Sequence, residues 1–127
     1  MFELTGKKVV VIGGSGGMGL ATAEAAVDAG AEVAIAARDQ ARLKAAAAAL
    51  TKRGKGRNAA WKSLRVEDRG AVAAFLKESA PFDHLVLPGS TVRPVLYDDL
   101  NEQEAADAFD SKFWGPFWAA YDARKHL

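Results

Sequence analysis

Glycine residues break the chain directly after its first apolar segment, and this pattern limits the possible folds more than any other feature. Residues 7–12 are mostly Val and Ile, five glycines fall between residues 13 and 19, and an alanine-rich segment follows Gly19. A continuous β-branched run predicts a strand buried on both faces, and the alanine-rich segment predicts a helix. A helix N-terminus preceded by glycines exposes bare backbone N–H groups, which is the arrangement that binds phosphate.

Apolar strand-like segments and helix-forming segments alternate along the rest of the chain. Strands are expected over residues 7–12, 32–36, 59–64 and 84–87, and helices over 17–29, 40–50, 69–79 and from Asn101 almost to the C-terminus. Asp39, Asp68 and Asn101 are placed to cap helices, and Pro116 is expected to kink or interrupt the last helix near Gly115. The alternation predicts an α/β fold, a doubly wound parallel sheet with strand order 3-2-1-4 and helices on both faces.

Composition restricts the class of protein further. The 127 residues suit one domain, half of them are hydrophobic, and the formal net charge of +1 argues against a dedicated nucleic-acid-binding protein. The chain has no cysteine, and His84 and His126 have no partner at ligand spacing, so no metal site is expected. The apolar run at residues 9–12 is too short for a secretory or membrane segment, which predicts a cytoplasmic protein without a membrane partner.

The glycine turn fits the dinucleotide-binding fingerprint in two registers. Gly14-x-Gly16-x-x-Gly19 is its general form, and Gly13-x-x-x-Gly17-x-Gly19 is a version with a longer loop. The strand before the turn and the helix after it supply the context that the fingerprint needs. The alternative is a glycine-rich turn without a ligand. A mononucleotide P-loop is excluded, because no Gly-Lys-Ser or Gly-Lys-Thr closes the loop.

The end of the second predicted strand indicates which dinucleotide binds. Ala37 stands where an NAD-binding protein usually has an acid for the ribose 2′-hydroxyl, and Arg38 follows it. A guanidinium can bind a 2′-phosphate through two parallel hydrogen bonds, so the pattern favours NADP(H) over NAD(H) as the cofactor. The alternative is that Arg38 is a solvated residue before the helix that Asp39 caps.

These residues resemble the short-chain dehydrogenase/reductase family. The family pattern Thr-Gly-x-x-x-Gly-x-Gly is matched over residues 12–19, with Ile12 in place of Thr, and residues 30–39 are also similar to the family. The resemblance implies a single NAD(P)-binding Rossmann-like domain over residues 1–127. It implies that the cofactor contacts Gly13, Ser15, Gly16, Gly17, Met18, Gly19, Arg38, Val66 and Gly89, with Glu67 or Asp68 as further neighbours of the adenine and Ser90 near the ribose.

The resemblance is weaker after the third predicted strand. Arg65 stands where the family has Asp, Leu-Pro-Gly-Ser at residues 87–90 replaces Asn-Asn-Ala-Gly, and Lys112 falls where the family has a catalytic-network Asn. The family's catalytic Ser, Tyr and Lys lie on later elements, so the resemblance implies a chain without the C-terminal catalytic half and without catalytic residues. The implied activity is hydride transfer to a carbonyl or from an alcohol. The alternative is a non-catalytic nucleotide-binding or self-associating module.

The last predicted helix carries two further features. Tyr121 and Lys125 match Tyr-x-x-x-Lys, but Ser111 lies on the same helix and a two-residue match carries little information, so we interpret it as coincidence. Aromatic residues recur at intervals of four, at Phe109, Phe113, Phe117 and Tyr121, with Trp114 and Trp118 beside them. They either pack against the sheet or join copies of the chain, and we expect a homo-oligomer formed through the 101–126 helix.

Overall fold

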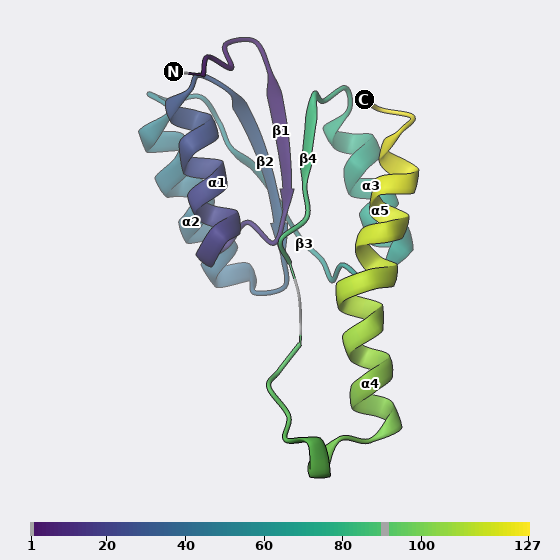
Figure 1. Cartoon of the computed structure of the whole chain (residues 1–127). Coiled ribbons are helices and arrows are strands. Elements are labelled where there is room, and N and C mark those ends of the chain that lie inside the picture. The colour runs from purple at the N-terminus through teal and green to yellow at the C-terminus, as the bar shows by residue number, and fades with distance from the viewer. Residues whose placement is uncertain (1, 90–91) are drawn as a thin grey trace.

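A parallel sheet forms the centre of the molecule in the computed structural model, which describes residues 2–89 and 92–127 (Figure 1). Its four strands lie in the order β3-β2-β1-β4. The strands are β1 (Lys8–Ile12), β2 (Glu32–Ala37), β3 (Ala60–Ser63) and β4 (His84–Val86). All three neighbouring pairs are parallel, and in the register of the sheet Val10 lies between Ala34 and Leu85. The predicted α/β fold and strand order are confirmed.

Helices cover both faces of this sheet, as predicted. They are α1 (Gly17–Asp28), α2 (Gln40–Arg53), α3 (Arg69–Ser79), α4 (Glu102–Phe109) and α5 (Gly115–Ala123). Helices α1 and α2 lie on one face, and α3 and α5 lie on the other (Figure 1). Val9 and Val11 of β1 belong to the first core, whereas Val10 and Ile12 belong to the second. Residues Val9 to Ile12 of β1 are all apolar and buried, because each face of the strand meets a helical layer.

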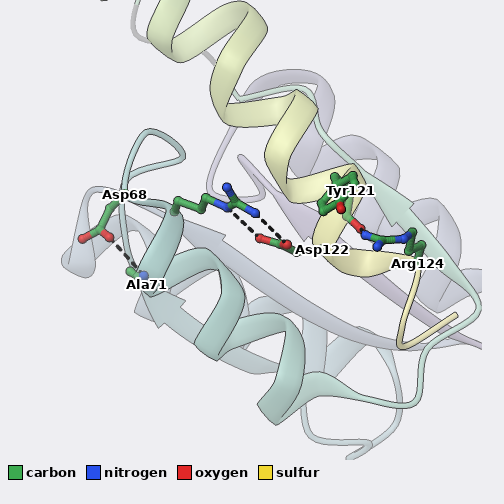
Figure 2. Close-up of polar contacts among 6 residues, drawn as sticks. Asp68, Ala71, Tyr121, Asp122 and Arg124 are labelled. Atoms are coloured by element: carbon green, nitrogen blue, oxygen red, sulfur yellow. Dashed lines mark hydrogen bonds and ion pairs between the residues drawn. The ribbon is translucent and has the colours of Figure 1, made fainter.

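Side-chain caps begin three of the helices at the predicted residues. Asp39, Asp68 and Asn101 each accept a hydrogen bond of 3.0 Å from the backbone N–H three residues later. Figure 2 shows the bond between Asp68 and the N–H of Ala71. Helix α1 begins differently, because Gly16 precedes it and no side chain caps it.

The predicted last helix is present but divided. A π-helical turn, Asp110–Trp114, separates α4 from α5 and ends immediately before Gly115 and Pro116. Proline cannot donate a hydrogen bond and its ring crowds the preceding turn, so a wider turn accommodates it. The predicted interruption near Gly115 is confirmed. Helix α4 extends beyond the sheet, next to residues 92–100 (Figure 1).

The aromatic side chains of the last helix do not pack against the sheet. Ala119 and Ala123 fill the inner face of α5, where both are buried, whereas Phe113 is 50% exposed and Phe117 46% exposed. These rings contact their neighbours on the outer face, with 6.0 Å between the centroids of Phe113 and Phe117. The interpretation that the aromatic residues pack against the sheet is therefore wrong, because small residues already occupy that face. None of the helices in the described part of the chain could span a membrane.

Candidate functional site

A cavity of about 600 Å³ lies at the carboxyl ends of β1 and β2, beside the segment that follows β4. Ligands of open α/β sheets bind at this edge, and the volume is typical of a small-molecule site. The cavity is lined by all the residues predicted to contact a cofactor, namely Gly13, Ser15, Gly16, Gly17, Met18, Gly19, Arg38, Val66 and Gly89. Glu67 lines a neighbouring cavity instead, and Ser90 lies outside the described residues.

Packing within the protein requires some of the glycines in the loop. A Cβ atom at Gly13 would lie 2.6 Å from the backbone nitrogen of Gly89, and Gly13 has a φ of +108°. A Cβ atom at Gly19 would collide with the carbonyl oxygen of Gly13, and one at Gly14 would lie 2.8 Å from Cβ of Ile35. Because these residues have no side chain, the loop can pack closely against β2 and against the segment after β4. They would be needed even in a glycine turn that binds nothing.

Gly17 has a different environment. Its φ is +54°, and no atom lies within 4 Å of the position that a Cβ would take. Packing therefore does not explain the missing side chain at this residue, which lines the cavity. The open space beside Gly17 fits a site in which the backbone closely approaches a ligand.

The N-terminus of α1 offers hydrogen-bond donors at the same place. The N–H groups of Gly13 and Gly14 donate to the carbonyl of Ala36 at 2.6 and 3.2 Å, which fixes the loop to β2. Beyond them, α1 begins without a side-chain cap and without an acidic residue in its first turn. The first N–H groups of a helix have no intrahelical acceptor, and the helix dipole favours an anion there. The diphosphate of a dinucleotide would supply both the acceptors and the negative charge.

Two arginines give the cavity a positive side. Arg38 follows β2, and its carbonyl accepts a hydrogen bond of 2.9 Å from Oγ of Ser63 in β3. Arg42, in the first turn of α2, also lines the cavity, and its guanidinium lies so close to Gly16 that a Cβ there would collide with it. Arg42 was not among the residues predicted from the sequence to line the site. Its spacing of three residues from the capping Asp39 could have placed it beside the end of β2.

The residues of the Tyr-x-x-x-Lys match lie away from this cavity. Tyr121 is 46% exposed on α5, where the guanidinium carbon of Arg124 lies 3.7 Å from its ring centroid (Figure 2). Ser111 is buried, and its hydroxyl donates to the carbonyl of Ala108 at 3.4 Å. Lys112 is exposed on the π-helical turn. Within residues 2–89 and 92–127, no group of three or more His, Cys, Asp or Glu side chains is placed to hold a metal ion.

An ion pair joins the two helices on the second face of the sheet. Arg69 at the start of α3 donates two hydrogen bonds of 3.1 Å to the carboxylate of Asp122 in α5 (Figure 2). These bonds are the main reason that the pKa of Asp122 lies below its ordinary value. The Arg69 guanidinium also lies 4.0 Å from a ring centroid of Trp118. The pair holds α5 against α3, next to the Val66 backbone that Gly115 approaches.

The parallel sheet, the glycine loop and the uncapped α1 define a doubly wound α/β protein of the nucleotide-binding type. The family model described as short chain dehydrogenase matches residues 7–127. The chain belongs to this family, whose members bind a nicotinamide dinucleotide.

Individual relatives agree with this assignment. The chain is 31% identical over 128 residues to the uncharacterized oxidoreductase YxnA of Bacillus subtilis, covering 98% of this chain and 35% of that protein. It is 34% identical over 118 residues to the short chain dehydrogenase/reductase AacuD of Aspergillus aculeatus, covering 91% and 42%. The chain thus spans less than half the length of these relatives.

Solved structures resemble the whole chain. One is an NADPH-bound short chain oxidoreductase from Pseudomonas aeruginosa PAO1 that contains an atypical catalytic center. It is 30% identical, with a TM-score of 0.91, and the match covers 100% of this chain and 51% of that one. A short-chain type dehydrogenase/reductase from Mycobacterium marinum is 27% identical with a TM-score of 0.90, and the match covers 98% and 51%.

Proposed function

We propose that this chain binds NADP(H) in the glycine-loop cavity and takes part in hydride transfer to a carbonyl or from an alcohol. The observation that carries the proposal is the convergence of the loop, the uncapped N-terminus of α1 and Arg38 on one cavity. The 30% identical relative that was solved with NADPH supports the same nucleotide. The nicotinamide would supply the hydride, and the residues of this chain would bind and orient the cofactor.

Each part of the cavity has a role in this proposal. The backbone around Gly17 and the first turn of α1 bind the diphosphate, with Ser15 and Met18 beside it. Arg38 binds the ribose 2′-phosphate through charge-assisted hydrogen bonds. Val66 contacts the edge of the adenine, and Gly89 lies near a ribose. An Asp or Glu at the end of β2 would favour NAD(H), and Ala37 stands there instead.

Calorimetric titration with NADPH and NADH tests this proposal. Replacing Arg38 with Asp is expected to weaken NADPH binding about 100-fold, because a charge-assisted contact is lost, and to leave NADH within about twofold. Lys44→Asp on α2 is the control, since Lys44 lines a different cavity. Equal losses for both nucleotides would contradict the NADP(H) preference. No binding of either nucleotide at millimolar concentration would contradict the cofactor site.

A second candidate function is a nucleotide-binding module without catalysis. Among the described residues that line the cavity there is no Tyr and no Lys, the residue types that the family's chemistry needs for proton transfer. Assaying NADPH oxidation with a panel of ketones and aldehydes separates the two functions. Binding without turnover supports the module, and turnover supports the oxidoreductase. Turnover that Tyr121→Phe abolishes would show that the Tyr-x-x-x-Lys match is not a coincidence.

We also propose that the outer face of α4 and α5 joins copies of the chain. Its large side chains are 46–63% exposed, at Phe109, Phe113, Trp114, Phe117 and Tyr121. Contiguous exposed apolar surface of this kind marks contact sites more often than free surface. The rings also stack on one another, as Trp114 and Trp118 do at 6.4 Å, which gives the face a fixed shape.

A further inference from the structure

Arg38 and Arg42 differ from the other arginines because their side chains have no hydrogen-bond or ion-pair partner among the described residues. Across residues 2–89 and 92–127, every other arginine binds a carboxylate or a backbone carbonyl: Arg53 binds Asp28, Arg65 binds Glu67, Arg69 binds Asp122, Arg93 binds Glu104, and Arg57 and Arg124 bind carbonyls. The two exceptions line the same cavity. Unpaired guanidinium groups that meet in one cavity indicate that the missing partner is an anionic ligand.

The stability of α2 does not explain the position of Arg42. It lies in the first turn of the helix, where the helix dipole disfavours a cation, whereas Lys52 and Arg53 lie in the last turn, where the dipole favours one. The carboxylate of Asp39 accepts a hydrogen bond from the backbone N–H of Arg42, so it serves the helix cap. The guanidinium itself lies against Gly16, directly before α1.

We infer that Arg42 acts with Arg38 to bind the 2′-phosphate of the nucleotide, and that Arg42 is a second residue that determines the preference for NADP(H). The inference rests on the proposed function. A phosphomonoester carries nearly two negative charges and three terminal oxygens, so it can accept hydrogen bonds from two guanidinium groups at once. The ribose 2′-hydroxyl of NAD(H) has no charge and cannot replace it. The diphosphate has its own donors in the glycine loop and α1.

The test compares Arg42→Gln with the wild type by calorimetry, using NADPH, NADH, 2′,5′-ADP and 5′-AMP as ligands. Arg42→Gln is expected to weaken NADPH and 2′,5′-ADP by about 10- to 100-fold, the usual cost of one charge-assisted contact. NADH and 5′-AMP are expected to stay within about twofold, because they lack the 2′-phosphate. Lys44→Gln removes the same charge from the same helix but outside the cavity, and is expected to change none of the four affinities by more than about twofold.

Two further readouts separate a binding role from a structural one. The melting temperature of Arg42→Gln is expected to equal or exceed that of the wild type, because the side chain has no partner to lose and its charge opposes the dipole of α2. Arg42→Lys keeps the charge but not the planar fork, so it is expected to restore part of the lost NADPH affinity.

The outcomes that overturn the inference are distinct from those that overturn the proposed function. Unchanged NADPH affinity in Arg42→Gln, or an equal loss for NADPH and NADH, overturns the role at the 2′-phosphate. The equal loss would assign Arg42 to the diphosphate instead. A wild-type protein that binds neither NADPH nor NADH overturns the proposed function and the inference with it.

Discussion

Two regions of the molecule differ in how completely contacts within the chain cover their side chains. Around β1, α1, β2 and α2, the glycine loop lies against β2 and the segment after β4, and Arg53 binds Asp28 between the two helices. Around β4, α4 and α5, the strand is only three residues long and pairs with β1 on one side, and residues 95–100 are exposed. We call the first the glycine-loop region, and contacts within the chain hold its loop in place. We call the second the α4–α5 region, and it exposes large apolar side chains such as Phe113 and Phe117.

The largest expected effect concerns the glycine-loop region. In Gly19→Ala, the new methyl group would collide with the carbonyl of Gly13, so the loop has to move away from the segment after β4. Overpacking of this kind costs about 3 kcal/mol of unfolding free energy, and the displaced loop no longer presents its N–H groups to a nucleotide. Urea denaturation and NADPH titration measure the two losses. An unchanged unfolding midpoint would show that the loop is not held by the contacts described.

A matched pair of glycines isolates ligand binding from backbone strain. Gly17 and Gly6 both have positive φ, +54° and +76°, and both have open space at the Cβ position. Only Gly17 lines the cavity. Gly17→Ala and Gly6→Ala are each expected to cost about 1 kcal/mol of stability, because alanine disfavours this conformation.

Only Gly17→Ala is expected to weaken NADPH binding, by about 10-fold or more, because its methyl group would occupy the space that we propose for the diphosphate. Thermal unfolding checks that the two variants are equally folded, and calorimetry measures the affinity. If both variants bind NADPH equally well, the open space beside Gly17 is not part of the site.

Some features of these regions could be predicted from the sequence and others could not. Strand β1, the caps at Asp39 and Asp68 and the strand order depend on local patterns and on topology rules, and the structure confirms them. The contact between Gly13 and Gly89 depends on residues far apart in the sequence, so no local pattern reports it. Arg42 was missed because an arginine early in a helix usually indicates solvated surface.

In the last helix a clear sequence pattern, the aromatic residues at intervals of four, was compatible with two interpretations. A stripe of aromatic residues at intervals of four has the same periodicity whether it faces the sheet or the solvent. The small residues Ala119 and Ala123 decide the orientation, because they let α5 approach its neighbours closely and leave the rings outside. An alanine-rich opposite face was present in the sequence, but its packing partner was not identifiable from it.

A substitution on the outer face of α4 and α5 tests whether a second copy of the chain binds there. Phe117→Ser is expected to weaken self-association about 10-fold or more, while the folding stability changes little because the ring is 46% exposed. Ala120→Ser is the control, since Ala120 is exposed on the same helix but is not one of the aromatic residues of this face. Analytical ultracentrifugation measures both. A wild-type protein that stays monomeric at about 100 μM, a concentration well above typical dissociation constants of protein dimers, would contradict the proposed interface.

The smallest expected effects concern the ion pairs of the two regions. Hydrogen bonds from Arg69 lower the pKa of Asp122 below its ordinary 3.8, and those from Arg53 lower the pKa of Asp28 in the same direction. A carboxylate whose pKa is lower in the folded state stabilises the protein above its unfolded pKa, and this contribution disappears as pH falls through the folded value. Asp122→Asn is therefore expected to lower the melting temperature by a few degrees at neutral pH. The gap from the wild type is expected to close as the pH falls below about 4.

Asp28→Asn is the matched variant in the other region, and its expected gap is smaller. The Asp28 side chain is 51% exposed, whereas that of Asp122 is 13% exposed, so water and salt screen the Asp28 pair more strongly. Thermal unfolding between pH 7 and pH 2, at low and high salt, measures both gaps. A gap for Asp122→Asn that persists at the lowest pH would show that packing of the side chain, not its charge, holds α5 to α3. A larger gap for Asp28→Asn would contradict this expectation. It would mean that the exposed Arg53–Asp28 pair stabilises the protein more than the less exposed Arg69–Asp122 pair.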